Sequence, residues 1–419
     1  MRIRELTLVN YRAFADPAPF KFSDRFTVVA GINGRGKTAL LDALALLSSR
    51  FLPLVSPALS GYRTINPSEI HEEANTAELT MKVNCAGIPA EYGVTYEREN
   101  RKLKKTSLPP ALKQAIRFAY GDPNRADDAA PLVVYYTTDR AGYRLPKKLP
   151  REVPKGQAAA YAGALFSRTV NFRDFMARYR NTVIMENDVR GQNPDYLGDR
   201  ARLAIVETIE TFLGGFNNLR VQEDPLRLLI DKEGITLDLT QLSDGERSFL
   251  ALISDLGRRL TLANPVLENP LEGAGVVLID ELELHLHPKW QREVVEKLRM
   301  TFPNIQFIAT THSPFIIQSL RPGELINLDP EEFAEYSDKS VEDIAENIMG
   351  VKLPQKSERF KEMVETAETY FRLVREAKPQ SEAERNQIRE RLDELSEPFS
   401  DDPAYVALLR IERETALGG

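Results

Sequence analysis

The sequence predicts an α/β fold built around a parallel sheet, and three stretches carry that prediction. The first is an apolar strand over residues 27–30 that turns into a helix over residues 38–48 through a loop with three glycines. The other two are short apolar runs, at residues 275–279 and 304–311, which are followed by two acids and by a histidine. Continuous apolar runs of strand length are typical of parallel strands that helices cover on both faces.

The N-terminal part predicts an additional antiparallel layer. Residues 2–9 alternate apolar and polar side chains, which is the period of a half-buried strand, and Phe20 and Phe22 suggest a second short strand. Two more strands are expected at residues 77–84 and 91–96. Nearly every side of the helix at residues 38–48 is apolar, so we expect this helix to be buried.

The middle of the chain predicts a further core strand at residues 132–136. Apolar residues at three- and four-residue spacing then indicate helices within residues 158–190 and 198–212, and a hairpin is expected around residues 232–234. No heptad pattern is sustained up to residue 240, so no coiled-coil arm is expected.

Composition and charge restrict the class of protein. Of the 419 residues, 42% are hydrophobic and 28% charged, as in soluble globular proteins. Cys85 is the only cysteine and cannot form an internal disulfide, and no apolar run approaches the roughly 20 residues of a membrane-spanning helix. The N-terminus has no apolar signal run, so we expect a reduced, cytoplasmic compartment and no membrane contact.

Local positive charge gathers in two places although the net charge is −7. These are residues 98–105 and a set that comprises Arg140, Arg144, Lys147, Lys148, Arg151 and Lys155. One interpretation is a solvated hairpin and loop. The other is a surface that contacts nucleic-acid phosphates, because clustered cations gain from counterion release whatever the net charge elsewhere.

Residues 31–38 match the pattern G-x-x-x-x-G-K-[ST], in which each part suits a bound phosphate. Glycines let backbone N–H groups converge, and the start of the following helix adds partial positive charge. Lys37 can reach the terminal phosphates, and Thr38 can bind Mg²⁺. The alternative is a glycine-rich turn that only connects a strand to a helix.

Residues 242–246 begin another helix with an apolar stripe. Ser243, Asp244 and Gly245 form a natural helix cap with exposed N–H groups. This stretch is therefore either a second phosphate site or an ordinary helix cap.

Polar residues follow the two later strands at the edge where open α/β sheets gather ligands. Asp280 can hold Mg²⁺, and Glu281 can polarise a water for attack on a γ-phosphate. His312 ends the next strand, and its position at this edge favours a catalytic role over a structural one.

Glu283, His285 and His287 stand close together and could bind a transition metal. Such sites use three or four ligands, and no other cluster of Cys or His supports one here. We therefore expect no transition-metal site.

The order of the motifs is itself informative. The motifs are residues 31–38, 242–246, 278–281 and 310–312. In this order they resemble the Walker A, signature, Walker B and H-switch motifs of ABC-type ATPases of the RecF, SMC and OLD-like group. The wording of the motifs is most similar to that of compact stand-alone bacterial ATPases, of which the ATPase subunit of the Septu anti-phage system is one.

The resemblance implies the fold in more detail. Residues 1–325 are expected to form an ABC-type P-loop ATPase head, a RecA-like mixed sheet with the antiparallel β layer beside it, and residues 140–220 a helical insertion within it. Residues 326–419 are expected to form a helical C-terminal extension, since apolar stripes recur at residues 360–374 and 388–395. In OLD nucleases a Toprim domain follows the H-switch. Because the sequence predicts only helices in this segment, no built-in nuclease is expected.

The resemblance also implies two cofactors, ATP and Mg²⁺, and the residues that hold them. Phosphates are expected at Asn33, Gly34, Arg35, Gly36, Lys37 and Thr38, and Mg²⁺ at Thr38 and Asp280. Glu281 is expected to act on the attacking water, and His312 to sense the γ-phosphate. Ser243, Gly245 and Glu246 are expected to contact the nucleotide of a second chain.

Two positions stay open at this level. Arg12 is either a further nucleotide contact or a plain surface arginine. No glutamine-led Q-loop is evident, and residues 66–70 are the candidate for this Mg²⁺-sensing turn.

One chain of this ATPase group cannot complete its own site, so the resemblance implies a homodimer or higher homo-oligomer that sandwiches ATP. The expected function is an ATP-dependent switch that senses DNA or controls a separately encoded nuclease in anti-phage defence. The alternatives are a RecF-like DNA-repair ATPase that binds DNA directly and a structural scaffold that holds ATP with little turnover.

Overall fold

The structure is a computed structural model of the chain. It describes residues 1–54, 63–85, 87–99, 102–105, 108–120, 130–141, 148–150, 152–153, 156–166, 172–329, 336, 339–349, 358–376 and 381–417. Contacts divide the chain into two compact units, Met1–Met349 and Gly350–Gly419. All of the predicted site residues lie in the first unit. The boundary expected at residue 325 stays a prediction.

A five-stranded parallel sheet forms the centre of the first unit. Its strand order is β13 (Leu325–Asn327), β3 (Phe26–Ala30), β12 (Ile305–Thr310), β11 (Gly275–Ile279) and β7 (Leu132–Tyr136). Every residue of β3, β7, β11 and β12 is buried, as the apolar runs predict. Because all neighbouring pairs are parallel, the segments that follow these strands meet at one edge of the sheet.

The predicted antiparallel layer is present beside this sheet. Its order is β2 (Ala18–Lys21), β1 (Arg2–Val9), β4 (Thr76–Cys85), β5 (Ile88–Glu97) and β6 (Lys102–Lys105). Burial alternates along β4, so one face of the layer is packed and the other faces solvent. The parallel and antiparallel sheets together confirm the predicted α/β fold class.

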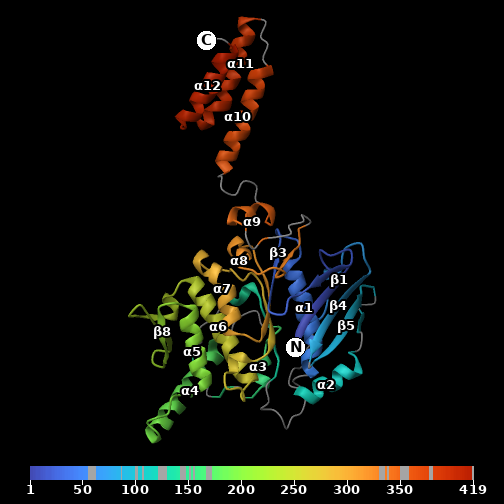
Figure 1. Ribbon diagram of the computed structural model, residues 1–419, viewed down its shortest axis with the longest axis vertical. Coiled ribbons are helices and arrows are strands. Elements are labelled where there is room, and N and C mark those ends of the chain that lie inside the picture. Colours follow the sequence, from blue (N-terminus) through green and yellow to red (C-terminus); the bar gives the residue numbers. More distant parts are fainter. Residues whose placement is uncertain are drawn as a thin grey trace. The chain divides into compact units, whose positions relative to one another are not determined.

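Helix α1 (Lys37–Phe51) lies between the two sheets (Figure 1). Most of its side chains are buried, as expected from its apolar composition. Gln306 of β12 joins the sheets a second time: its side chain accepts from the Ile3 N–H at 2.8 Å and donates to the Ile3 carbonyl at 2.8 Å. The layer is therefore fixed to the sheet that carries the phosphate loop.

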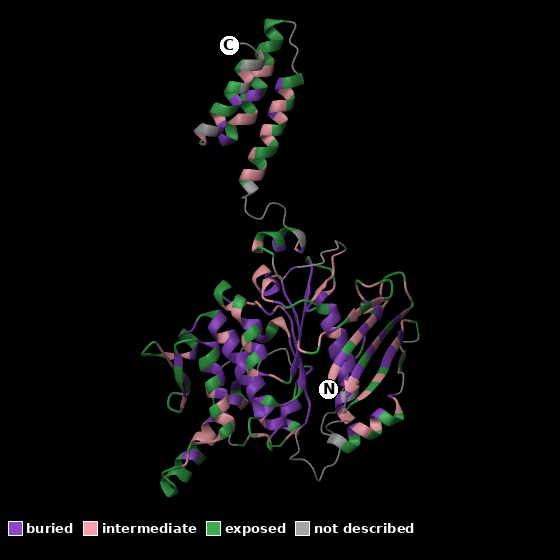
Figure 2. Ribbon diagram, viewed as in Figure 1, coloured by how far each residue is buried: buried purple, intermediate pink, exposed green. Residues whose placement is uncertain are grey.

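Helices cover the opposite face of the parallel sheet (Figure 1). They are α3 (Ala158–Tyr161), α4 (Phe172–Gln192), α5 (Arg200–Phe212), α6 (Asp244–Ala263) and α7 (Pro288–Thr301). Most residues of α6 are buried, and it lies at the centre of this helical layer (Figure 2). Helix α5 confirms the helix predicted within residues 198–212, but its buried residues are Ile205, Thr208, Ile209 and Phe212, whereas Leu203 of the apolar pattern is exposed.

A small antiparallel sheet lies beside these helices. It contains β8 (Phe216–Gln222), β9 (Arg227–Lys232) and β10 (Ile235–Asp238), in the order β10-β9-β8. The hairpin of β9 and β10 confirms the prediction around residues 232–234, whereas β8 is an addition to it.

Three short helices complete the first unit: α2 (Pro110–Tyr120), α8 (Pro314–Gln318) and α9 (Val341–Asn347). The second unit contains α10 (Glu358–Glu376), α11 (Glu382–Ser396) and α12 (Pro403–Leu417). These three helices enclose a separate apolar core that includes Tyr370, Leu392 and Leu409. In the part of the chain that the structure describes, no helix combines the length and apolarity needed to cross a bilayer.

Candidate nucleotide-binding site

The loop of residues 31–36 has the backbone that its glycines predict. Gly31, Gly34 and Gly36 have φ angles of 147°, 85° and 97°, a range that residues with a Cβ rarely adopt. A Cβ on Gly36 would lie 2.7 Å from the ring of Phe14, so a side chain is excluded there. Residues 32–35 are exposed, which leaves the backbone N–H groups of residues 33–35 accessible to an anion at the start of α1.

Lys37 folds back over this loop. Its Nζ donates to the carbonyl of Gly31 at 2.7 Å and to that of Ile32 at 3.0 Å. Burial lowers the pKa of Lys37, and the carboxylates of Asp329 and Glu281 partly oppose that shift. The loop therefore combines the positive charge of Lys37 with its own N–H groups. Both attract a terminal phosphate.

Thr38 and Asp280 meet across the edge of the sheet. The Thr38 hydroxyl donates to the Asp280 carboxylate at 3.1 Å, and the Thr310 hydroxyl donates to it at 2.6 Å. Hydroxyl and carboxylate oxygens are the ligands that Mg²⁺ prefers. These residues therefore fit a magnesium ion.

Glu281 has a fixed backbone and an unused carboxylate. Its φ angle is 49°, a left-handed value that is uncommon outside glycine. Its N–H donates to the Thr310 hydroxyl at 2.7 Å, and its carbonyl accepts from the Leu284 N–H at 2.9 Å. Among the described residues, no group donates a hydrogen bond to its carboxylate, which is therefore available to a water molecule.

Arg140 supports the backbone of both acids. Its guanidinium donates to the carbonyls of Asp280 and Glu281, and to that of Thr137 at 3.2 Å. The side chain is 3% exposed, and burial lowers its pKa to about 10 against the opposing effect of the nearby acids. Arg140 therefore stays charged at neutral pH and fixes the turn that carries Glu281.

This finding corrects the interpretation of the basic region. Arg140 belongs neither to a solvated loop nor to a nucleic-acid surface, because it is buried under the acids. Arg98 is also occupied, since it donates to the carbonyls of Ile70 and His71 at 2.9 Å. Lys104 is exposed and pairs with Glu97. Arg144, Lys147, Arg151 and Lys155 lie outside the described residues.

His312 follows β12 and reaches the same edge. Its backbone N–H donates to the carboxylate of Glu283, and the hydroxyl of Thr311 donates to the other oxygen of that carboxylate at 2.7 Å. No described residue forms a hydrogen bond with the imidazole of His312. The ring is therefore available to a group that binds at this edge.

The other histidines of this region have different surroundings. His287 caps α7, with its Nδ1 accepting from the Lys289 N–H at 3.2 Å, and His285 is exposed with a φ of 62°. Within the described ranges, no group of three Cys, His, Asp or Glu residues is arranged to hold a metal ion by itself.

Ser243 and Glu246 form a reciprocal cap at the start of α6. The Ser243 hydroxyl donates to the Glu246 carboxylate at 2.9 Å, and Lys232 donates to it at 2.6 Å. Burial raises the pKa of Glu246, but the bonds from Lys232 and Ser243 outweigh it and hold the pKa below its ordinary value. A Cβ on Gly245 would lie 2.2 Å from the carbonyl oxygen of His285. No hydrogen bond or ion pair between described residues joins this cap to residues 31–38.

Arg12, which follows β1, and residues 66–70, which precede β4, lie together. The Arg12 guanidinium pairs with Asp42 at 2.8 Å and with Glu69, and the Arg12 N–H donates to the Glu69 carbonyl at 2.7 Å. Asp42 is one helical turn after Thr38. The segment beside Asp280 is instead Thr138–Ala141, which follows β7 and includes Arg140.

Asp329 is a further neighbour of the phosphate loop that sequence reasoning missed. Its carboxylate accepts from the Ile32 N–H at 2.8 Å and from the Arg35 Nε at 2.8 Å. Asp329 lies two residues after the end of the edge strand β13. That strand was itself too short to be predicted from the sequence.

Residues 26–318 match the family model described as "AAA domain, putative AbiEii toxin, Type IV TA system". The chain belongs to this AAA-domain family. The match contains the phosphate loop, the cap at Ser243, the acids and His312. The prediction of an ATPase is confirmed at this level.

Named relatives of this AAA-domain protein are retron ATPases and a Septu protein. The "Retron Vc95 probable ATPase" of Vibrio cholerae serotype O1 biovar El Tor is 29% identical over 78% of this chain and 73% of its own length. The "Retron Ec83 probable ATPase" of Escherichia coli is 29% identical over 76% and 70%. "Septu protein PtuA" of Bacillus thuringiensis is 31% identical over 31% of this chain and 37% of its own length. The predicted resemblance to this ATPase group is confirmed.

Solved SMC heads are similar to part of the AAA-domain protein. The "SMC head domain from Thermotoga maritima" is 17% identical, covers 78% of this chain and 94% of that chain, and gives a TM-score of 0.45. An SMC head bound to the C-terminal winged-helix domain of ScpA gives a TM-score of 0.46 at 15% identity, over 76% of this chain and 92% of that chain.

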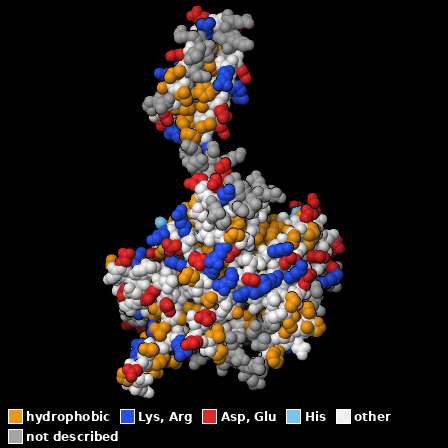
Figure 3. Space-filling model, in the orientation of Figure 1, with side chains coloured by type: hydrophobic (Ala, Val, Ile, Leu, Met, Phe, Trp, Pro, Cys, Tyr) orange, Lys and Arg blue, Asp and Glu red, His pale blue; other side chains and the backbone are white. Residues whose placement is uncertain are grey.

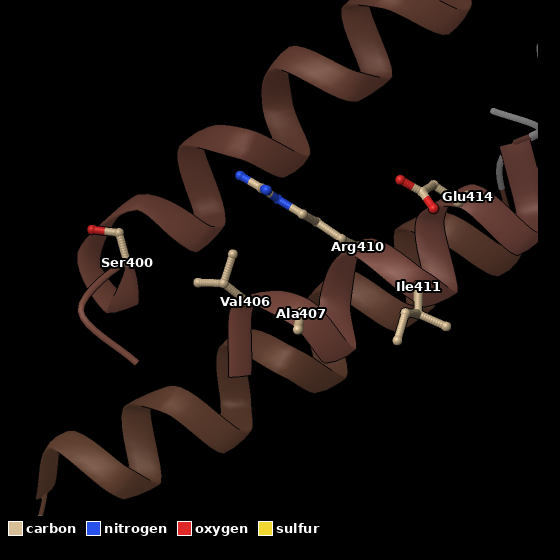
Figure 4. A pocket seen from close by; sticks show the side chains of 6 residues that line it. All are labelled: Ser400, Val406, Ala407, Arg410, Ile411 and Glu414. Carbon is tan, nitrogen blue, oxygen red and sulfur yellow. The ribbon is translucent and has the colours of Figure 1, made fainter. Parts of the chain in front are cut away.

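A groove of about 460 Å³ lies in the second unit, which contains none of the predicted site residues. Ser400 and residues of α12 line it, with Arg410 and Glu414 as its charged members (Figure 4). Its lining lacks the glycine-rich backbone and the acid pair of the nucleotide site. The groove is therefore no competitor for the phosphate loop as the nucleotide site.

Proposed function

We propose that the protein is an ATP-hydrolysing switch whose two ATP molecules are sandwiched between two copies of the chain. The proposal is carried by the division of the motifs in space. Lys37, Thr38, Asp280 and Glu281 meet at one sheet edge, whereas the cap at Ser243 makes no bond to that edge within the described chain. A site of this kind is completed by the cap of a second copy.

In this proposal each residue of the edge has one task. Lys37 and the N–H groups of residues 33–36 bind the phosphates, and Thr38 and Asp280 hold Mg²⁺. The ion, when bound, neutralises negative charge on the phosphate oxygens. Glu281 accepts a hydrogen bond from the attacking water and orients it toward the γ-phosphate, and His312 contacts the same phosphate.

The second copy supplies the remaining wall. Ser243 and Asp244 are exposed at the start of α6, and a helix start attracts anions such as phosphate oxygens. ATP then contributes contacts to both chains and favours the dimer, while hydrolysis removes them. Nucleotide state is thereby converted into association state.

The switch controls a separately encoded effector, a nuclease, in anti-phage defence within the cytoplasm. This part of the proposal is supported by the relatives, which are named as retron ATPases and as a Septu protein. Copurification with the products of neighbouring genes tests it. We expect a stable complex whose nuclease activity differs between ATP and ADP, and no complex or an ATP-independent activity would contradict it.

The central experiment compares the wild type with Glu281→Gln and Lys37→Ala. We expect Glu281→Gln to bind ATP, to lose phosphate release and to accumulate as a dimer in light scattering. Lys37→Ala should lose both binding and dimerisation. Phosphate release by Glu281→Gln at the wild-type rate would instead favour an ATP-holding scaffold.

Direct DNA binding is the second candidate. On the face shown in Figure 3, Lys and Arg side chains form a broken row across the larger unit. Such a row suits a phosphate backbone, and its contribution would weaken steeply with salt. Charge reversal at Lys102, Lys104 and Lys105 tests whether the strand β6 takes part: loss of salt-sensitive, ATP-dependent DNA binding supports it, and unchanged binding excludes these three lysines.

A further inference from the structure

Hydrogen bonds join two short segments at the edge of the parallel sheet. One follows β11 and contains Asp280, Glu281 and Glu283, and the other runs from Thr310 to His312 at the end of β12. The Thr310 carbonyl also accepts from the Leu282 N–H at 2.9 Å, so each of the three residues at the end of β12 bonds to the first segment.

The three acids of the first segment are used differently. Asp280 accepts from Thr38 and Thr310, and so it belongs to the metal position. The Glu283 carboxylate has both oxygens engaged, one with the Thr311 hydroxyl at 2.7 Å and one with the His312 N–H. The Glu281 carboxylate, in contrast, receives no hydrogen bond from the described residues. Glu283 is thus not placed as an alternative base.

We propose that Glu283 is a positioning residue that fixes His312 relative to Glu281. Charge-assisted hydrogen bonds to a carboxylate are shorter and stronger than neutral ones, so Glu283 gives the His312 backbone its firmest attachment to the acid segment. Only Leu282 separates Glu283 from Glu281. A displacement of His312 is therefore transmitted to the turn that holds Glu281. This inference rests on the proposed hydrolysis at Glu281.

The bonding pattern distinguishes geometry from charge. Glutamine at position 283 retains a carbonyl oxygen for the His312 N–H, and its amide can donate to the Thr311 hydroxyl. Alanine offers neither contact. Position 281 needs a charged carboxylate for its task, so glutamine and alanine should be equally harmful there.

The test is a matched set of four variants: Glu283→Gln, Glu283→Ala, Glu281→Gln and Glu281→Ala. We expect Glu283→Ala to lower kcat by about 10- to 100-fold, the cost of a misplaced catalytic group, with KM for ATP within about threefold of wild type. Glu283→Gln should keep most of the activity. Both Glu281 variants should be inactive. An inactive Glu283→Gln, or a fully active Glu283→Ala, would overturn the proposal.

A second readout does not depend on hydrolysis. Hydrogen exchange of the segment around His312 should accelerate by at least about tenfold in Glu283→Ala and stay near wild type in Glu283→Gln, because exchange follows local opening. Absence of hydrolysis in the wild type would contradict the proposed function, whereas unchanged exchange in Glu283→Ala would contradict the positioning role.

Two further variants separate the role of Glu283 from misfolding. Thr311→Val removes one of the two contacts to Glu283 and also the acceptor of the Ser313 N–H at 3.0 Å, so we expect an intermediate loss of kcat together with a lowered melting temperature. Glu293→Ala, on α7 in an i,i+4 pair with Lys297, is the surface control and should behave as wild type. Wild-type kcat in Thr311→Val together with a misfolded Glu283→Ala would count against the proposal.

Discussion

The hydroxyl of Thr38 donates to the carboxylate of Asp280 at 3.1 Å, although 242 residues separate the two in the sequence. This bond joins the first turn of α1 to the end of β11 across β12, the strand between β3 and β11. The proposed Mg²⁺ position consequently exists only in the assembled sheet, because it takes Thr38 from the phosphate-loop motif and Asp280 from the segment after β11.

Loss of either oxygen ligand should abolish hydrolysis. We expect Thr38→Val and Asp280→Asn each to reduce phosphate release by at least about 100-fold, since positioning of this kind supplies several kcal/mol of the barrier. Thr38→Ser keeps the hydroxyl and is the matched control, with a rate within about threefold of wild type. Chelation of Mg²⁺ should stop the wild-type reaction, and Thr38→Val activity near wild type would contradict the assignment.

Replacement of Arg140 should impair catalysis through the backbone of Glu281. Methionine resembles the aliphatic part of the arginine side chain but leaves the carbonyls of Asp280 and Glu281 without their donor, at a cost of about 1–3 kcal/mol in the free energy of unfolding. We expect kcat to fall by about 10- to 100-fold. Arg292→Met is the control, because Arg292 is exposed and lies over the Phe315 ring at 4.9 Å. Equal effects of the two variants would contradict the role of Arg140.

A side chain at residue 245 should disturb the turn at His285. Gly245→Ala places a carbon 2.2 Å from the His285 carbonyl oxygen, so one of the two segments must move. We expect a loss of about 1–3 kcal/mol in urea unfolding, as in other overpacked sites. Gly191→Ala is the helical control, because nothing lies within 4 Å of its added carbon. It should be neutral or slightly stabilising, and a Gly245→Ala variant as stable as Gly191→Ala would refute the contact.

Asp255 should stabilise the fold in a pH-dependent way. Burial raises its pKa, but the charges of Arg259 and Arg258 outweigh that effect and hold the pKa well below its usual range. Its contribution is therefore complete above the unfolded pKa of about 3.9 and declines as the pH falls below that value. Asp255→Asn leaves two buried guanidinium groups without their carboxylate and should cost about 3–5 kcal/mol at pH 7.

Urea unfolding at pH 7, 5 and 3 measures this dependence. We expect the difference between wild type and Asp255→Asn to be similar at the two higher values and smaller at the lowest. Asp24→Asn, in an exposed pair with Arg4, should cost less than about 1 kcal/mol at every pH. A difference that grows on acidification would mean that the carboxylate is not the charged partner of these arginines.

Much of the fold was predictable because its strands are apolar runs between recognisable turns. Strand β8 was missed since Asn218 has a left-handed φ of 53° and a register shift interrupts the pairing after Asn217, so its residues look like a turn. Strand β13 has only three residues, too few for any period to show.

The sequence motifs predicted part of the site. Lys37, Thr38, Asp280 and His312 lie where the motifs place them, and their roles stay predictions. Arg140, Glu283 and Asp329 were not assigned to the nucleotide site. Each acts through a partner that is distant in the sequence, as Arg140 does on Asp280 and Asp329 on Arg35. Local spacing contains no information about such partners, although an arginine that closely follows a buried strand is a usable signal.

Asp255 also connects two parts of the molecule. It lies on α6 and accepts from the Tyr136 hydroxyl at 3.0 Å, while the Tyr136 carbonyl accepts from the Asp280 N–H at 2.9 Å. We therefore expect a partner that shifts α6 to change the affinity for nucleotide through this chain of hydrogen bonds. By thermodynamic reciprocity, nucleotide then changes the affinity for that partner by the same factor, so either ligand can be used to titrate the other.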